Sequence, residues 1–117
     1  MSITDEGLDL QKAARIRELN DRFRMSFTGG RFTMTDGVNA LPERTKVAVI
    51  QNVRGYSKFG PDNDPWHEHD FGSFALAGEK FFWKIDYYDK SMDAGSEDPS
   101  DPAQTTRVLT ILLADEY

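Results

Sequence analysis

The sequence predicts a small α+β domain in which helices pack on a mainly antiparallel sheet, in two layers with a central hairpin. Two observations carry this prediction: a helical pattern opens the chain, and strand-like patterns flank the turn Ala77-Gly78 in the second half. A chain of 117 residues without cysteine is expected to fold as one domain, residues 1–117, around one core with no disulfide bonds.

The first expected element is a helix over residues 5–24. Thr4 is its expected N-cap, and acidic residues in the first turn suit the helix dipole. The apolar stripe consists of Leu8, Ile16, Leu19 and Phe23. The other face is expected to be solvated and carries Arg15, Glu18, Asp21 and Arg22.

A short strand is expected over residues 31–35, between Gly29-Gly30 and a turn at Asp36-Gly37. The glycine pair is interpreted as a turn, because the Gly-Lys-Ser/Thr of a phosphate-binding loop does not follow it. A second helix is expected from Pro42 to Gly55, since proline favours helix starts and glycine favours helix ends. Its apolar arc is Val47, Val49, Ile50 and Val53.

A turn-rich loop over residues 57–65 leads into the hairpin, whose strands are residues 71–76 and 80–87. A polar, acidic stretch over residues 89–104 is expected to be an irregular surface loop. The last strand, residues 108–113, is a nearly continuous apolar run and is therefore expected to be buried on both faces.

The hairpin register follows from the turn. Pairing outward from Ala77-Gly78 places Phe74 opposite Phe81, and Gly72 opposite Trp83, where glycine leaves room for the indole. Because side chains alternate along a strand, one face gathers a good apolar set. The members of this core face are Phe74, Leu76, Phe81, Trp83 and Ile85.

Extending the same register places His69 opposite Asp86 and His67 opposite Tyr88, on the face away from the core. A carboxylate beside an imidazole fixes its tautomer, as in catalytic dyads and around metal ions. The favoured interpretation is structural: His69 bonds Asp86 or a loop backbone group and pins residues 62–64 to the sheet. A catalytic pair of a hydrolase or nuclease is the alternative. No metal site and no cofactor are expected, because the chain has two histidines and lacks the zincin spacing.

Charged residues are distributed unevenly between the two halves of the chain. Residues 1–58 carry 10 basic and 7 acidic residues, whereas residues 59–117 carry 4 basic and 13 acidic ones. A net charge of −6 argues against direct binding of nucleic acid and leaves a basic protein as the expected partner. Aromatic side chains beside the acids suit an interface. The candidate binding residues are Trp66, His67, His69, Phe82, Tyr88, Asp93, Glu97, Asp98 and Asp101.

No membrane association is expected. The N-terminus carries Asp5, Glu6 and Asp9 instead of the basic region of a signal peptide. No apolar run approaches the roughly 20 residues of a membrane span. The sequence therefore predicts a cytoplasmic protein.

Several long motifs in the second half resemble a known family. They are Pro-Asp-Asn-Asp-Pro (residues 61–65), Glu-His-Asp-Phe-Gly (68–72), Phe-Trp-Lys-Ile-Asp-Tyr-Tyr-Asp (82–89) and the ending from Arg107 to Tyr117. The chain resembles a family of small bacterial proteins of unknown function that are often encoded on plasmids and integrative elements. The resemblance supplies no catalytic residue, and its pattern includes His69 but does not fix His67 as histidine.

The resemblance implies a role for mobile elements, such as interference with host restriction or CRISPR systems. The leading expectation is thus a non-enzymatic binding protein, an anti-restriction or anti-CRISPR inhibitor that acts on a basic nucleic-acid-binding protein through an acidic, aromatic surface. The alternatives are a small hydrolase or nuclease using His69 and Asp86, and a structural subunit of an oligomer.

Overall fold

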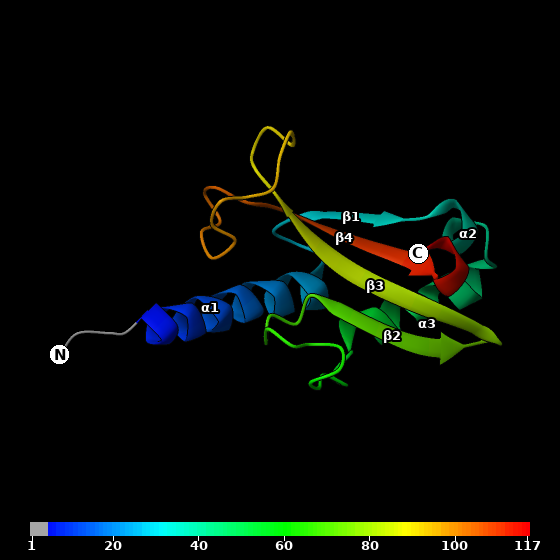
Figure 1. Cartoon of the computed structure of the whole chain (residues 1–117). Helices are drawn as coiled ribbons and strands as arrows, with labels where there is room; N and C mark the ends of the chain where they lie inside the picture. The colour runs from blue at the N-terminus through cyan, green and yellow to red at the C-terminus, as the bar shows by residue number, and fades with distance from the viewer. Residues whose placement is uncertain (1–4) are drawn as a thin grey trace.

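The computed structural model describes residues 5–117 as a four-stranded sheet with its two longer helices on one face (Figure 1). The elements are α1 (Asp5–Ser26), β1 (Arg31–Met34), α2 (Asp36–Asn39), α3 (Glu43–Arg54), β2 (Phe71–Leu76), β3 (Glu79–Tyr88), β4 (Thr106–Leu113) and the 3₁₀ turn η1 (Ala114–Glu116). The strand order is β1-β4-β3-β2, with β1 parallel to β4 and the other pairs antiparallel. The predicted α+β class is confirmed. The predicted N-cap Thr4 lies outside the described residues.

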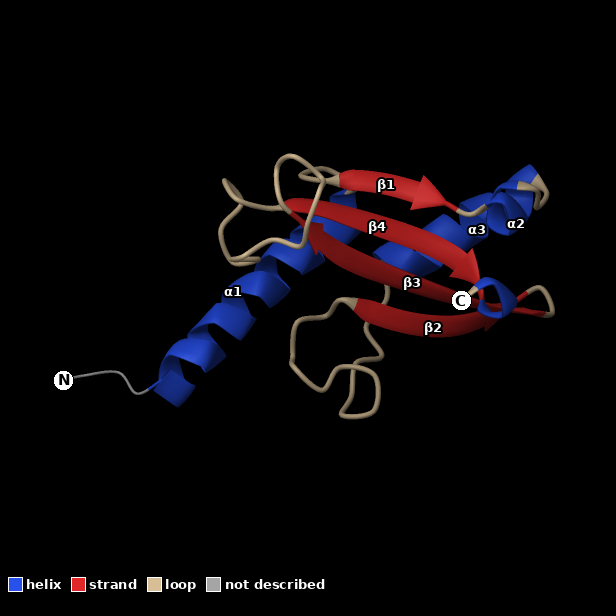
Figure 2. Cartoon of the chain, turned by 45° about the horizontal axis from the view of Figure 1, so that its top comes forward, coloured by secondary structure: helices blue, strands red, loops and turns tan. Residues whose placement is uncertain are grey.

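Helix α1 packs on the sheet through its C-terminal half, and its N-terminal half projects past the sheet (Figure 2). Ile16 and Phe23 of the predicted stripe are buried, but Leu8 is 44% exposed because nothing from the sheet reaches it. The same stripe buries two polar residues that the apolar pattern does not reveal, Asn20 and Arg24. The contact between α1 and the sheet is therefore partly polar.

The segment after β1 differs from the prediction. The expected turn at Asp36-Gly37 is the start of α2, a single helical turn that buries Val38 completely. Helix α3 begins directly after Pro42, as predicted. Its Val49 and Val53 are fully buried in the core, whereas Val47 points to solvent and is 53% exposed.

The hairpin has the predicted register. Phe74 pairs with Phe81 and Gly72 pairs with Trp83. Trp83 is fully buried at the centre of the core, where the rings of Tyr56 and Phe59 meet it edge-on at centroid distances of 5.4 and 6.1 Å. Strand β3 lies in the middle of the sheet and β2 at its edge.

Strand β4 is buried along its helix-facing side, but on its other side only Leu112, which is 4% exposed, is buried. Leu109 and Ile111 point to the helices and are fully buried, but Val108 and Thr110 are only half-buried. Their side of the sheet faces away from α1 and α3, and the C-terminal residues lie against it (Figure 1). We call this side the open face. Its principal side chains are Phe71, Phe82, Lys84, Asp86, Tyr88, Val108, Thr110 and Leu112.

Candidate functional site

The chain changes direction just before β2, and this decides where His69 lies. His67 and His69 adopt left-handed backbone conformations, with φ of 60° and 55°. The carbonyl of Asp70 accepts a hydrogen bond from Ile85 N at 2.8 Å, so regular pairing reaches Asp70 and ends there. A strand cannot continue through residues with positive φ, and the extrapolated register fails at His69.

His69 is held by two carboxylates. Its Nδ1 lies 2.9 Å from Asp21 Oδ1, and its Nε2 lies 3.4 Å from Asp64 Oδ2. The backbone N–H of His69 donates to Asp64 Oδ1 at 3.0 Å, and the imidazole stacks on Phe59 with a centroid distance of 3.7 Å. We call His69, Asp21, Asp64 and Phe59 the His69 clasp. It fastens the loop over residues 57–70 to α1.

The predicted His69–Asp86 pair is therefore wrong. Asp86 lies on the open face, where its Oδ2 is 3.0 Å from Lys84 Nζ. His69 makes contacts of the kind that the structural interpretation expected, but these contacts hold the loop to α1 and not to the sheet. Asp21 was expected to be solvated, yet it also accepts a hydrogen bond from the buried Arg24 at 3.0 Å.

A second polar cluster, the Arg107 network, lies beside the clasp. Arg107 Nε donates to Asn20 Oδ1 at 2.7 Å, and Asn20 Nδ2 donates to the Glu68 carbonyl at 3.0 Å and to the Tyr87 hydroxyl at 2.8 Å. The Tyr87 hydroxyl donates to Glu68 Oε1 at 2.8 Å. Burial and the charge of Glu68 raise the pKa of Tyr87, so this phenol stays a hydrogen-bond donor at neutral pH.

Two predicted binding residues lie on the open face. The Phe82 ring contacts Phe71 and Tyr117 at centroid distances of 5.3 and 5.2 Å. Tyr88 lines a hollow of about 450 Å³ with Lys84, Asp86, Val108, Thr110 and Leu112. This hollow and the aromatic cluster meet at Tyr117, which is 76% exposed.

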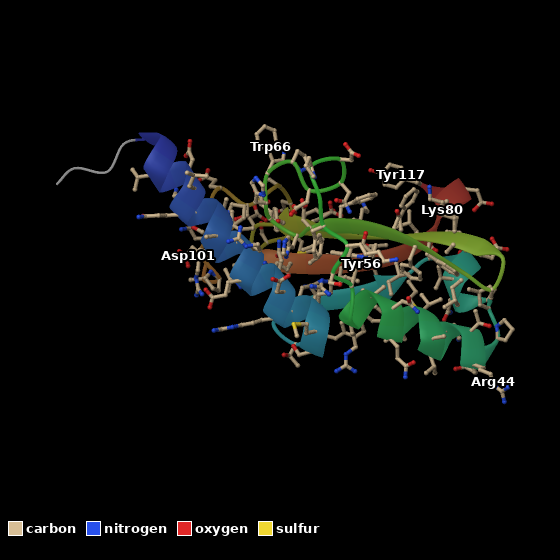
Figure 3. All side chains as sticks on the ribbon, turned by 90° about the horizontal axis from the view of Figure 1, so that it is seen from below. Arg44, Tyr56, Trp66, Lys80, Asp101 and Tyr117 are labelled. Atoms are coloured by element: carbon tan, nitrogen blue, oxygen red, sulfur yellow. The ribbon has the colours of Figure 1, made fainter. Side chains whose placement is uncertain are left out.

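Trp66 and His67 lie on the loop before β2, apart from Phe82 and Tyr88. Trp66 is 76% exposed and borders a hollow of about 330 Å³ against Lys12 and Ile16 of α1. The His67 side chain is exposed, and its carbonyl accepts a hydrogen bond from Arg17 at 3.0 Å. Figure 3 shows Trp66 and Tyr117 on the side of the molecule away from α3.

The four predicted acidic residues divide into two pairs. Asp98 accepts hydrogen bonds from Ser100, and Asp101 accepts them from Ala103 N and Gln104 Nε2, so these carboxylates shape the loop. The bond from Ser100 lowers the pKa of Asp98, and the bond from Gln104 lowers the pKa of Asp101. Asp93 and Glu97 are exposed, and their carboxylates face solvent. We call the loop over residues 89–104 the acidic loop.

The surroundings of His69 occupy both of its ring nitrogens. Both ring nitrogens of His69 already face carboxylates, and the ring is covered by Phe59. Within residues 5–117, the acids and histidines form no group of three or more that is placed to hold a metal ion. The helices of this part of the chain are too short or too polar to cross a membrane.

One family model, described as "Protein of unknown function (DUF3768)", matches residues 34–116, which is more than two thirds of the chain. The chain belongs to DUF3768. No curated protein and no solved structure matches it. The DUF3768 match includes β2, β3, β4, α3, the acidic loop and His69, while α1, which supplies Asn20 and Asp21, and all of β1 except Met34 precede it.

Replacing His69 with alanine in this DUF3768 protein is expected to lower the free energy of unfolding by about 1–3 kcal/mol, because Asp21 and Asp64 lose their shared partner. His67→Ala is the matched control, since His67 has the same backbone conformation and an exposed side chain. Urea unfolding of both variants measures the difference. Equal losses in the two variants would contradict a clasp role for His69.

Asp70 gives the DUF3768 chain a testable pH dependence. Burial, followed by the charge of Glu68, raises the pKa of Asp70 from 3.8 to about 6. The folded state therefore binds more protons than the unfolded state between these values, and this group's contribution to stability falls as pH rises through them. Asp70→Asn is expected to stabilise the protein by about 1 kcal/mol at pH 7, after allowance for solvent screening, and to change little at pH 3.5. Thermal unfolding at both pH values measures this, and an equal shift at both would contradict it.

Proposed function

We propose that this DUF3768 chain is a non-enzymatic binding protein that holds a basic, nucleic-acid-handling protein against its open face and acidic loop. The observation that carries the proposal is the open face itself. It has aromatic and aliphatic side chains around a hollow of about 450 Å³, and the two longer helices lie on the opposite side of the sheet.

The composition of the open face suits a protein partner. Phe82 and Tyr117 supply aromatic area of the kind that contributes most of the affinity at protein interfaces. The Lys84–Asp86 ion pair is partly exposed on the central strand β3 and makes one side of the hollow polar. Protein interfaces combine apolar contact area with such polar groups.

The charge of the acidic loop indicates which class of protein would bind the open face. The acidic loop begins where β3 ends, and Tyr88 forms an isolated bridge with Gly95 of that loop. The exposed Asp93 and Glu97 thus belong to a loop that is fixed at the Tyr88 end of the open face, the end away from the Phe82–Tyr117 contact. Such carboxylates accelerate association with a basic surface, and nucleic-acid-binding proteins carry basic surfaces.

We further propose that the partner belongs to a bacterial CRISPR or restriction system, and that the chain is an anti-defence protein of a mobile element acting in the cytoplasm. The resemblance to proteins encoded on plasmids and integrative elements supports this role, as does the net charge of −6. An acidic inhibitor would occupy the groove that nucleic acid otherwise fills.

Phage plating on restricting and CRISPR-immune bacteria tests the proposal. Expression of the wild-type chain is expected to raise plating markedly on at least one such host. The double variant Asp93→Lys/Glu97→Lys is expected to lose the effect. The control Glu43→Lys reverses an exposed charge on α3, on the helical side of the sheet, and is expected to keep it.

The opposite results identify the alternatives. Unchanged plating in every host would overturn the anti-defence role. A doubled mass by light scattering that Phe82→Ala returns to the monomer value would replace the proposal with self-association, the oligomer alternative. The hydrolase alternative would have to use other groups than the His69–Asp86 pair, because His69 faces Asp21 and Asp64.

A further inference from the structure

A hollow of about 260 Å³ lies between α1, the turn before β1 and the acidic loop, and its charged lining is entirely cationic. Three cations line it: Arg22 from α1, Lys90 from the acidic loop and Arg107 from β4. Thr28 and Gly29 form another part of the wall, and no acidic side chain takes part in the lining. Such a concentration of positive charge is unusual in a chain whose net charge is −6.

Arg107 is the most informative of the three cations because it is only 3% exposed. Its Nε donates to Asn20 Oδ1, Nη2 donates to the Pro99 carbonyl, and the guanidinium lies 5.3 Å above the Tyr87 ring. Each of these partners is uncharged, and among the described groups Nη1 has no acceptor. A buried cation normally has an anionic partner.

Glu68, whose charge acts on Arg107, does not take that role. The Glu68 carboxylate accepts its hydrogen bond from the Tyr87 hydroxyl and affects Arg107 only at a distance. Burial lowers the pKa of Arg107, but a guanidinium remains charged throughout the physiological range. Arg107, one of the residues that line the hollow, therefore carries a charge without an ion-pair partner among the side chains that the structure describes.

The Gly29-Gly30 pair brings a backbone turn to this hollow. A methyl group on Gly30 would lie 2.6 Å from the Arg107 carbonyl and 2.8 Å from the Phe23 ring, so only glycine allows this close approach. Gly29 has a φ of 92° with open space around its Cα, and it lines the hollow. The pair thus holds the turn against the first residues of β4, directly beside Arg107.

We propose that this hollow binds a phosphate group, either as inorganic phosphate or as the terminal phosphate of a 5′-mononucleotide. Guanidinium and ammonium groups are the side chains that recognise phosphate oxygens most strongly. Arg22 is available for this role, since its present partner Glu18 forms only an exposed pair with it. The hollow is distinct from the open face and does not depend on the function proposed above.

Titrations of the full chain with sodium phosphate and with a 5′-mononucleotide, at constant ionic strength, test the proposal. Amide resonances of Thr28 and Gly29 are followed by NMR, and the melting temperature is measured in parallel, because a ligand of the folded state raises it. Saturable shifts with phosphate are expected. Tighter binding of the mononucleotide would identify a nucleotide as the source of the phosphate, and equal binding would identify the free ion.

The double variant Arg22→Gln/Lys90→Gln leaves the buried Arg107 in place and is expected to weaken phosphate binding about tenfold, a loss of about 1.4 kcal/mol. The control Arg44→Gln/Lys58→Gln removes two exposed cations outside the hollow and is expected to bind as the wild type does. Equal weakening in both double variants would reveal general charge screening and overturn the proposal. So would the absence of saturable shifts in the wild type.

Discussion

Replacing Asn20 with leucine is expected to lower the free energy of unfolding by about 3 kcal/mol. Asn20 is fully buried and joins α1 to three other segments through Arg107, the Glu68 carbonyl and Tyr87. Leucine has a similar volume but leaves these groups without partners inside the protein. The loss of an acceptor for a buried guanidinium is the largest part of the expected cost.

Urea denaturation followed by circular dichroism measures this loss as a lower midpoint with an unchanged slope. Asn52→Leu is the control: Asn52 is exposed on α3, bonds only the Ala48 carbonyl of its own helix, and is expected to change stability by less than about 0.5 kcal/mol. A similarly small effect at Asn20 would show that water replaces the amide and would contradict the structural role of the Arg107 network.

Substituting alanine for Gly72 is expected to cost about 2 kcal/mol through overpacking. A methyl group at this position would lie 2.5 Å from Trp83 Nε1 and 2.6 Å from Tyr56 Cζ. Neither ring has room to move, because Trp83 is fully buried and the Tyr56 hydroxyl takes part in hydrogen bonds with Ser73 N and Asn63. The fluorescence of Trp83 is expected to change together with the loss of stability.

Gly60→Ala is the control for this substitution, since a methyl group on Gly60 meets no atom within 4 Å. The double variant Gly72→Ala/Trp83→Phe adds a sharper test. The smaller phenyl ring leaves space for the methyl group, so the two costs are expected to be less than additive by about 1 kcal/mol. Strict additivity would mean that Gly72 and Trp83 do not compete for the same space.

The hairpin could be predicted from sequence because its information is local. Alternation in β2 and β3 sets the faces, and Gly72 opposite Trp83 fixes the register within a few residues of the turn. Helix α3 could also be predicted, because Pro42 and Gly55 mark its ends. The open face could not be predicted, because an apolar run such as β4 does not indicate which of its sides another element will cover.

The candidate site was harder to predict for two physical reasons. The positive φ values of His67 and His69 end the strand pattern without any glycine to signal it. The true partner of His69 is Asp21, which is 48 residues away on a helix face that looks solvated. Asn20 and Arg24 share this difficulty, because polar residues in an apolar stripe are recognised as buried only when their partners are known.

The position of β4 has a consequence for how the protein forms. It lies between β1 and β3, although it is the last strand in the sequence. During synthesis, β1 and the β2–β3 hairpin cannot belong to one sheet until residues 106–113 have left the ribosome. Pairing of Arg31 with Val108 also closes a very long loop, which slows folding. The nascent chain therefore exposes unpaired strand edges until its final strand arrives, and exposed edges of this kind favour aggregation during that interval.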